Sequence, residues 1–501
     1  MKLVSPTLLR LSARSLQDCI YCIRRHTHQH AHLDLSHSNL PSPRLDYRSI
    51  SENILYKSHN AFNRKSLLPV GTVQNVARLY NDFKALSSEL NRKLASRNRI
   101  TEEVKKTKDA TVKQDAIEKA KSLKTEISEL KVRVVELEEQ LLQTALLLPN
   151  DTHPDTPIGP EEAAVTLSTH GPSPLPESLS RDHVRIAKSL NLLDLDAGST
   201  VTGTSWYYLI NEGALLELAL INYSISIAMK HGFKPVIPPD VVKADVALRC
   251  GFQPRDKGDM QQMYHIASDS RKEHPELVLS GTAEIPLAGL FANKVVEESQ
   301  LPLKVVAVGK AFRAEAGARG SDTRGLYRVH QFTKVELFAV ASESQSSEIM
   351  EDMKNVQAEI ISGLNVPFRI LDMPTEELGA SAYRKYDIEA WMPGRGKWGE
   401  VTSTSNCTDY QSRRLHIRYR PSSVSRASAT DNQSESLERQ SLPFAHTLNG
   451  TAAAIPRLII ALLENGARLS GDEVAGLDLP SALKPFWIDK LDKNPLKLRW
   501  I

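Results

Sequence analysis

The sequence contains few cysteines and no long hydrophobic run, and its charges nearly balance. Four cysteines among 501 residues argue against a disulfide-stapled scaffold and fit a reducing compartment. No apolar segment approaches the roughly 20 residues that a membrane-spanning helix needs, so we expect no membrane association. With 63 basic and 60 acidic residues, the formal net charge is only +3, and any surface that binds nucleic acid must therefore be local.

Acidic residues are scarce in the first 44 positions, where only Asp18 and Asp34 occur. The same segment is rich in serine and arginine and carries the Leu/Arg pattern LLRLSAR near its start. It lacks the long apolar core of a secretory signal, and its composition is typical of a mitochondrial transit peptide. We therefore predict a leader at residues 1–44 and a location in the mitochondrial matrix.

A zinc site is the alternative interpretation of this leader, because Cys19 and Cys22 form a C-x-x-C that is followed by several histidines. Finger-type structural zinc sites need a second ligand pair at a defined spacing. The sequence contains no such pair, so the leader interpretation is preferred.

Two heptad-like patterns predict a helical hairpin within residues 45–150. The first pattern comprises Val76, Leu79, Phe83, Leu86, Leu90 and Leu94. The second comprises Ile117, Ala120, Leu123, Ile127, Leu130, Val134, Leu137 and Leu141. A polar stretch near residues 106–113 separates them, which indicates two antiparallel helices with a short connection. At 1.5 Å per residue each helix would be about 45–50 Å long, so the hairpin would project as an arm.

The predicted arm carries an excess of basic residues. Between Arg92 and Lys124 there are eleven Lys or Arg and five Asp or Glu, and 11 − 5 gives a local charge of +6. Such charges are commonly the solvated face of a coiled coil. They also suit a surface that follows the phosphates of a structured RNA. The arm sequence alone leaves both interpretations open.

The remaining chain divides into a linker and a large mixed domain. Residues 151–176 are rich in Pro, Thr, Asp and Gly, which favours a linker. Residues 177–501 show mixed helical and strand patterns, as expected for a catalytic domain. Within this domain, residues 421–441 are dominated by Ser, Arg, Asn and Gln and predict a long exposed loop.

A charged segment between Phe312 and Phe338 reads FRAEAGARGSDTRGLYRVHQFTKVELF. We predict strands over 305–312 and 327–340, joined by a glycine-rich turn. Side chains alternate along a strand, so one face would hold Arg313 and Glu315 and, on the second strand, Arg328, His330, Phe332, Lys334 and Glu336. Such a face could bind phosphate, a base and an amine. It could equally be a surface sheet with cross-strand ion pairs.

Three further stretches combine polar residues with the start or end of a strand. In LSGTAEIPL, Thr282 and Glu284 would share one face, and in WGEVTSTSN, Glu400 and Thr402 would do so. In HTLNGTAAAIPRLIIALLEN, a strand leads into an apolar helix with Arg457 in its first turns, which would reinforce an anion site. Each stretch alone also has a simple structural explanation, such as a helix cap or an ion-paired side chain.

Taken together, the motifs TAE, FRAEAG…DTRGLYRVHQFTKVE, EVTSTSN…DYQSRR and HTLNGT…PR resemble those of the seryl-tRNA synthetase family in order and approximate spacing. The resemblance extends from Leu45 to the C-terminal LPSALKPFW, and the leader suggests a mitochondrial form. It implies an α+β catalytic domain of class II, with an antiparallel sheet flanked by helices. It also implies a tRNA-binding coiled-coil arm and a homodimer, whose interface motif would be FKPVIPPDVV.

The resemblance implies that the enzyme activates L-serine with ATP and transfers it to tRNA(Ser), and to tRNA(Sec) where that pathway exists. The implied serine-binding residues are Thr282, Ala283, Glu284, Glu336, Asn449 and Thr451. The implied ATP-binding residues are Arg313, Ala314, Glu315, Val329, Phe332, Glu400, Val401, Thr402, Ser403 and Arg457. Among them, Arg313, Glu315 and Arg457 would be catalytic, and Glu400 and Ser403 would hold Mg²⁺.

The chain departs from the family pattern in three places. Ser321 stands where the family's hairpin loop has an arginine, and Arg319 lies two positions earlier. Thr402 replaces a common serine, and the 421–441 loop is longer than in bacterial relatives. An inactive paralogue that binds RNA or protein is the alternative function. Retention of the charged site residues favours the active enzyme.

Overall fold

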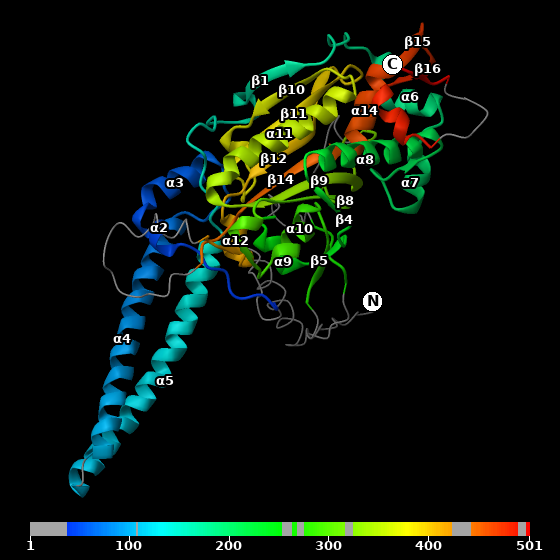
Figure 1. Cartoon of the computed structure of the whole chain (residues 1–501). Helices are drawn as coiled ribbons and strands as arrows, with labels where there is room; N and C mark the ends of the chain where they lie inside the picture. Colours follow the sequence, from blue (N-terminus) through cyan, green and yellow to red (C-terminus); the bar gives the residue numbers. More distant parts are fainter. Residues whose placement is uncertain are drawn as a thin grey trace, which may run out of the picture.

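The computed structural model describes residues 38–106, 109–252, 263–267, 275–315, 324–422, 442–488 and 497–501. Most of the predicted leader, including the C-x-x-C, lies outside the described residues. So do the hairpin tip with Arg319 and Ser321 and almost all of the 421–441 loop. The described part contains a helical arm and a larger domain built on a sheet (Figure 1).

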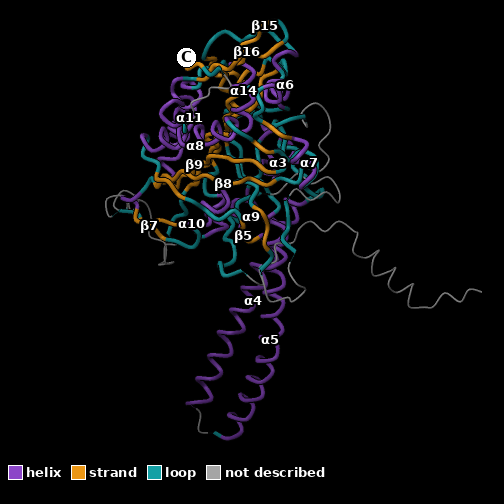
Figure 2. The backbone as a smooth tube through the Cα atoms, turned by 90° about the vertical axis from the view of Figure 1, so that its right-hand side faces the viewer, coloured by secondary structure: helices purple, strands orange, loops and turns teal. Residues whose placement is uncertain are grey.

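The arm is an antiparallel pair of long helices, α4 (Thr72–Lys106) and α5 (Ala110–Leu146). Their 35 and 37 residues correspond to lengths of about 52 and 55 Å. Two short helices, α2 (Tyr47–Glu52) and α3 (Ile54–Asn63), lie at its base. The arm projects from the sheet domain in two perpendicular views (Figures 1 and 2). The predicted hairpin is therefore confirmed.

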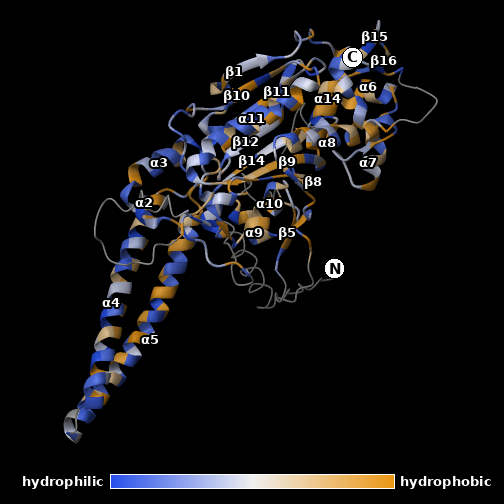
Figure 3. Cartoon of the chain, viewed as in Figure 1, coloured by the Kyte–Doolittle hydropathy of each residue, from blue (hydrophilic) through white to orange (hydrophobic). Residues whose placement is uncertain are grey.

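The predicted heptad seam is most deeply buried near the base of the arm. Val76 and Leu141 are fully buried there, whereas Ile117 near the tip is 44% exposed. Farther out, the Lys93 ammonium and the Glu126 carboxylate join the two helices at 2.5 Å. Hydrophilic residues predominate along α4 (Figure 3), so the outer arm presents a polar and largely basic surface.

The larger domain contains an eight-stranded sheet of order β1-β10-β11-β12-β14-β9-β8-β4. Neighbouring strands are antiparallel except β4 and β8, which are parallel. Its strands are β1 (Val165–His170), β4 (Lys234–Val236), β8 (Leu303–Phe312), β9 (Gln331–Ala341), β10 (Phe368–Asp372), β11 (Arg384–Met392), β12 (Lys397–Asn406) and β14 (His446–Ala454). This arrangement confirms the predicted α+β class.

Helices cover both faces of this sheet. On one face lie α8 (Glu212–Lys230), α11 (Ser346–Gly363) and α14 (Ile455–Gly466), and on the other lie α9 (Ala244–Arg249), α10 (Glu284–Phe291) and α12 (Tyr410–Leu415). Strand β9 has apolar side chains on both faces that need covering. Val335 and Leu337 pack in the core on the first face, and Phe338 and Val340 pack in the core on the second. Helix α8 is apolar and long enough to span a membrane by length and composition alone, but it packs into the first core.

The smaller elements complete the periphery of the domain. Helices α6 (His183–Ser189) and α7 (Leu195–Val201) lie near the pair formed by β2 (Leu193–Asp194) and β3 (Tyr208–Leu209). Other pairs are β5 (Val241–Lys243) with β6 (Leu277–Leu279), and β7 (Val295–Glu297) with β13 (Arg418–Arg420). The last sheet contains β15 (Ala467–Ser470), β16 (Glu473–Leu479) and β17 (Arg499–Trp500).

The predicted linker at 151–176 is corrected by the structure. Residues 165–170 form β1, which pairs with β10 at one edge of the main sheet. The segment therefore belongs to the sheet domain. The arm is also fixed to that domain, because the Asn150 side chain donates hydrogen bonds to the carbonyls of Ser381 and Cys407, both at 2.9 Å.

The second strand of the charged hairpin begins at Gln331, four residues later than predicted. The residues before Gln331 form hydrogen bonds with segments outside the sheet. The Leu326 amide donates to His183 Nε2 at 3.2 Å, and the His330 amide donates to the Ser205 carbonyl at 3.2 Å. The prediction that Arg328 and His330 lie on the strand was therefore wrong, because both precede it. It was right for Lys334 and Glu336.

Candidate active site

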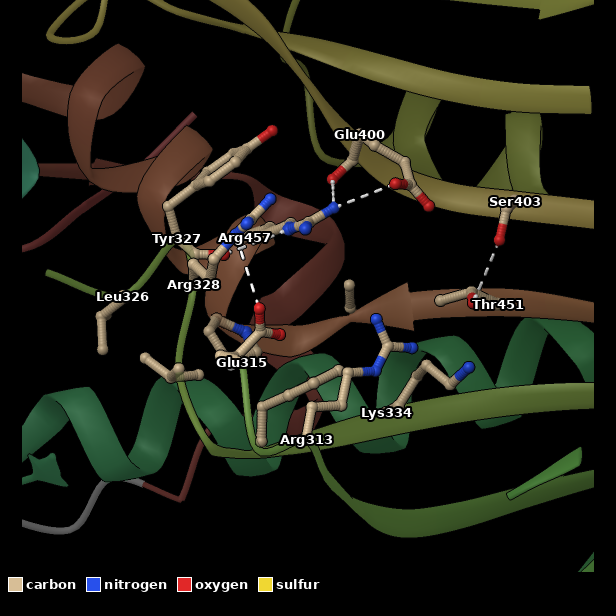
Figure 4. Close-up of a pocket in the computed structure, with 14 residues that line it drawn as sticks. Arg313, Glu315, Leu326, Tyr327, Arg328, Lys334, Glu400, Ser403, Thr451 and Arg457 are labelled. Atoms are coloured by element: carbon tan, nitrogen blue, oxygen red, sulfur yellow. Dashed lines mark hydrogen bonds and ion pairs between the residues drawn. The ribbon is translucent and has the colours of Figure 1, made fainter. Parts of the chain in front are cut away.

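A cavity opens on the second face of the sheet, beside the end covered by α9, α10 and α12. Strands β9, β12 and β14 and the start of α14 form its walls. The cavity is lined by Arg313, Glu315, Leu326, Tyr327, Arg328, Val329, Phe332, Lys334, Glu400, Ser403, Thr451, Ala454, Pro456 and Arg457. Figure 4 shows Glu400 and Arg457 on one side of this cavity, with Arg313 and Lys334 opposite. Residues from the charged hairpin, WGEVTSTSN and HTLNGTAAAIPR, three of the four stretches singled out in the sequence, thus meet here.

The cavity exists because β12 and β14 separate beyond their last paired residues, Thr404 and Gly450. From the opposite face, the fully buried Gln357 of α11 donates from Nε2 to the carbonyls of Ser403 and Thr451, at 2.7 and 2.8 Å. Its Oε1 accepts from the Thr404 hydroxyl at 2.5 Å. Gln357 therefore fixes the spacing of the two strands where they line the cavity, and no sequence motif indicated this role.

A β-bulge in β12 decides which of its side chains reach the cavity. Glu389 of β11 pairs with Glu400, whereas the preceding Ile388 pairs with Thr402, so Val401 is the extra residue. A bulge of this kind interrupts the alternation of faces. Glu400 and Ser403 therefore line the cavity, while Val401 and Thr402 are fully buried away from it. The prediction that Glu400 and Thr402 share a face was wrong for this reason.

Two arginines face each other across the cavity. Arg457 donates from Nη1 to the Glu400 backbone carbonyl at 2.9 Å and to its carboxylate at 3.2 Å, and its guanidinium lies over the Tyr327 ring. Arg313 donates from Nε to the Gly281 carbonyl at 3.4 Å and lies 5.4 Å from the Phe332 ring centroid. Within the described part of the chain, Arg313 forms no ion pair.

The charges of these residues influence one another. Burial and the positive charge of Arg457 lower the pKa of Arg313. Burial alone would raise the pKa of Glu400, but the positive charges of Lys385, Arg457 and Arg313 outweigh it and lower that pKa to about 2. Glu400 is therefore an anion at neutral pH. Arg313 and Arg457 thus offer cationic groups for a polyanion, and Glu400 offers an anionic group for a cation.

Glu315 and its neighbours form the rim next to the hairpin. Glu315 has a φ of 47°, and its carboxylate lies 3.7 Å from Arg328 Nε. The backbone between Arg313 and Glu315 passes through Ala314, and Val329 is buried where it lines the cavity. The ion pair holds the two ends of the hairpin loop together, although Arg328 is not on the strand.

A second group of charges lies deeper, at the start of α10 and on β9. Glu336 is 1% exposed, and its carboxylate lies 2.7 Å from the Lys334 ammonium. Burial and the charge of Glu336 raise the pKa of Glu284 to about 7. Above that pH, two carboxylates face one lysine. The remaining negative charge suits one further ammonium group.

Neutral polar groups border this acidic pair. Thr282 is 3% exposed and Ala283 is 4% exposed, and Ala283 precedes the first residue of α10. On β14, Thr451 pairs directly with Glu336, and the Thr451 hydroxyl lies 3.5 Å from the Ser403 hydroxyl. Asn449, on the same face as Thr451, donates to Cys407 Sγ at 3.4 Å. The structure therefore brings all six predicted serine-binding residues to one region.

Several lining residues were absent from the predicted site. The sequence did indicate Lys334 and Arg328, because both belong to the charged hairpin and were predicted on its polar face. The others are uncharged and lie within the quoted motif stretches, but no role was predicted for them. They are Leu326, Tyr327, Ala454 and Pro456.

Glu400 and Ser403 provide oxygen ligands of the kind that Mg²⁺ prefers. Arg457 binds one oxygen of the ionised Glu400 carboxylate, which leaves the other for a cation. Among the described residues, no group of three or more His, Cys, Asp or Glu side chains could hold a metal by itself. The pair therefore fits an ion that takes its remaining ligands from a substrate and water.

Two family descriptions match the chain. Residues 45–152 match the seryl-tRNA synthetase N-terminal domain, and residues 264–466 match the tRNA synthetase class II core domain (G, H, P, S and T). The mitochondrial serine–tRNA ligase of Saccharomyces cerevisiae is 39% identical over 455 residues, which cover 89% of this chain and 95% of the relative. The mitochondrial enzyme of Schizosaccharomyces pombe is 41% identical over 447 residues, 88% of each chain.

Two solved structures share the arm and the sheet domain. The seryl-tRNA synthetase of Pyrococcus horikoshii complexed with ATP has a TM-score of 0.77 and 33% identity, covering 88% of this chain and 98% of that one. The cytoplasmic serine–tRNA ligase of Naegleria fowleri in complex with AMP has a TM-score of 0.72 and 25% identity, covering 89% and 98%. This chain belongs to the seryl-tRNA synthetase family.

Proposed function

We propose that this protein activates L-serine with ATP to form seryl-adenylate and then transfers serine to tRNA(Ser) in mitochondria. The observation that carries the proposal is the cavity itself. Two facing arginines, Arg313 and Arg457, line it, and behind Lys334 the buried acids Glu284 and Glu336 lie near enough to interact electrostatically with Arg313. A polyphosphate and an ammonium group can therefore occupy adjoining parts of one site.

In the first step, a serine carboxylate oxygen attacks the α-phosphorus of ATP, and pyrophosphate leaves from the opposite side. No protein nucleophile is required, so catalysis depends on positioning and charge stabilisation. Arg313 would contact the α-phosphate and the reacting carboxylate, and Arg457 the terminal phosphates. Their planar guanidinium groups suit bidentate binding of phosphate. Phe332 would stack on adenine beside Val329, and Glu315 would complete the nucleotide site.

Serine would be selected by groups that satisfy its ammonium and hydroxyl. Glu336 and the ionised Glu284 suit the ammonium, and Asn449 and Thr451 would bind the carboxylate or the hydroxyl. Thr282 and Ala283 complete the wall. A site built to hydrogen-bond a hydroxyl rejects an analogue without one, because its own buried polar groups then lose their partner. Alanine should therefore be a poor substrate.

Glu400 and Ser403 would hold Mg²⁺ together with the phosphates of ATP. When bound, the ion would neutralise charge that develops on those phosphates. The side chains of Val401 and Thr402 are buried, so these residues would contribute through their backbone, which places Glu400 and Ser403 next to the nucleotide. The depressed pKa of Glu400 keeps its carboxylate ready for a cation at neutral pH.

The arm and the exposed surface support the proposed partners. The basic surface of α4 and α5 suits the phosphate backbone of tRNA(Ser), and of tRNA(Sec) where that tRNA exists. In the segment FKPVIPPDVV, Ile237 is 94% exposed and Val241 is 41% exposed, which supports a homodimer. The acid-poor leader and the mitochondrial relatives support a location in the matrix.

Serine-dependent exchange of pyrophosphate into ATP tests the proposal. We expect exchange with L-serine and far less with L-alanine or without an amino acid. Arg313→Ala should lower the rate by at least about 100-fold, whereas Arg185→Ala, at an exposed position of α6 away from the cavity, should retain it. Binding of tRNA without any exchange would instead support the inactive paralogue.

A further inference from the structure

The first described residues, Ser38 to Arg44, lie against the sheet domain. We call this segment the strap. It continues from the base of the arm along the lower edge of the domain, near α12 and α9 (Figure 1). Ser38 donates its hydroxyl to the Asp245 carboxylate at 2.6 Å, and the Arg44 amide donates to the Arg413 carbonyl at 2.9 Å.

Further contacts fix the middle of the strap. His416 Nε2 donates to the Ser42 carbonyl at 2.7 Å. Leu40 packs against the core beneath α9 and α10, and Pro43 is buried. Polar and apolar contacts therefore hold the segment over its whole length, as in an integral part of a domain and unlike a disposable leader.

Arg249, at the end of α9, takes two of its hydrogen-bond acceptors from the strap, in addition to the Arg414 carbonyl and the Asp245 carboxylate at 3.6 Å. Its side chain is fully buried at 0% exposure, and burial lowers its pKa. Nη1 donates to the carbonyls of Pro41 and Arg414 at 2.8 and 2.6 Å, and Nη2 donates to the Ser38 hydroxyl at 3.3 Å. A buried charge is destabilising unless it is paired and hydrogen-bonded. The strap supplies two of the acceptors that make this burial tolerable.

These contacts continue toward the acidic end of the cavity. Arg414, which accepts from Arg249, belongs to α12. In the same helix, Gln411 donates to the Glu284 carboxylate at 2.6 Å and to the Cys250 carbonyl at 3.0 Å. The strap, α9, α12 and the start of α10 are thus linked by consecutive hydrogen bonds. Loss of the strap should loosen the wall that positions Glu284.

We propose that the strap is a permanent part of the catalytic unit and that proteolytic removal of the leader ends before Ser38. The leader boundary at residue 44 is thereby moved toward the N-terminus. A cut after Arg44 would take away two hydrogen-bond partners of Arg249 and the core contact of Leu40. The statement about processing rests on the mitochondrial location proposed above, whereas the structural role of the strap does not.

A pair of truncations tests the structural role in the purified protein. Removal of residues 1–37 should leave the Tm within about 1 °C of the full chain, with unchanged KM for serine. Removal of residues 1–44 should lower the Tm by about 5 °C or more and raise the KM for serine several-fold. If the protein lacking residues 1–44 does not fold but the protein lacking residues 1–37 does, that result also supports a structural role for the strap. Equal Tm and KM for the two truncations would overturn the proposal.

Point variants separate the strap contacts from a general effect of chain length. In the full chain, Arg249→Met should lower the Tm of the protein by a similar amount, because it removes the group that the strap binds. Asn39→Ala, at an exposed strap position, is the matched control and should leave the Tm unchanged. A Tm for Arg249→Met that equals the control would count against the strap.

Mass spectrometry of the N-terminus of the protein isolated from mitochondria tests the processing limit. The expected first residue lies at or before Ser38. A mature N-terminus at Leu45 or within the strap would overturn the processing claim. A chain that never enters mitochondria would contradict the proposed location, and the truncation pair would then decide the role of the strap independently.

Discussion

Replacing Gln357 with methionine would remove the amide that spaces β12 and β14, at nearly constant volume. Gln357 donates to the Ser403 and Thr451 carbonyls at 2.7 and 2.8 Å and accepts from the Thr404 hydroxyl at 2.5 Å. A buried polar group left without a partner costs about 1–3 kcal/mol. Three such groups at the low end give about 3 kcal/mol. In a chain of this length, a loss of this size should lower the Tm by roughly 3 °C.

Thermal melting followed by circular dichroism measures this loss, and the exchange assay measures its effect on the site. The KM values for ATP and serine should both rise in Gln357→Met, because the Ser403 and Thr451 hydroxyls are no longer held at their spacing. Asn355→Met, an exposed amide on the same helix, is the matched control. If both variants melt within about 1 °C of the wild type, the reasoning is refuted.

Arg313→Lys should recover only a small part of the exchange activity lost in Arg313→Ala, because lysine lacks the bidentate guanidinium fork; full recovery would show that charge alone suffices. The folded pKa of Glu284, about 7, lies above the ordinary 4.5, so its contribution to stability is complete below pH 4.5 and is lost as the pH rises to 7. Glu284→Gln should therefore flatten the Tm of the ligand-free protein between these pH values, and an unchanged profile would argue against the raised pKa. Lys105→Glu with Lys106→Glu should reduce charging of tRNA severalfold and leave serine-dependent exchange intact, whereas a parallel loss of exchange would place their effect elsewhere.

The arm was predictable because its pattern is local. Leucine and isoleucine at spacings of three and four define two helices, and the polar stretch between them defines the turn. The structure differs mainly in length, since α4 and α5 extend a few residues beyond the apolar seam. The extra turns near the tip are mainly polar, whereas those at the base contain buried apolar residues such as Val73 and Leu142, and the 3-4 spacing does not mark where either helix ends.

The charged side chains of the site were predictable as residue types, but their placement was not. Simple alternation assigned Lys334 and Glu336 to the correct face, because β9 is regular there. It failed at Thr402, where a bulge adds one residue, and it does not explain the place of Arg328, which lines the cavity although it precedes the strand. Both failures come from tertiary constraints that leave no local trace in the sequence.

Other features could not be predicted from the sequence, because they depend on contacts between segments that are distant in the chain. Gln357 lies on a helix opposite the cavity, and nothing in its sequence neighbourhood connects it with Ser403 or Thr451. The segment 165–170 looked like part of a linker because proline and glycine flank it, yet it pairs with β10 at the sheet edge. Edge strands are short and receive little support from their own sequence, since the partner strand supplies the hydrogen bonds.

The central claim is that one cavity binds serine and the nucleotide side by side. Isothermal titration of the purified protein with a non-hydrolysable sulfamoyl analogue of seryl-adenylate tests it most directly. We expect one binding site for which ATP competes, with an affinity for the analogue at least about 100-fold weaker in both Arg313→Ala and Glu336→Gln. Binding that is unaffected by both substitutions, or that ATP does not displace, would contradict it.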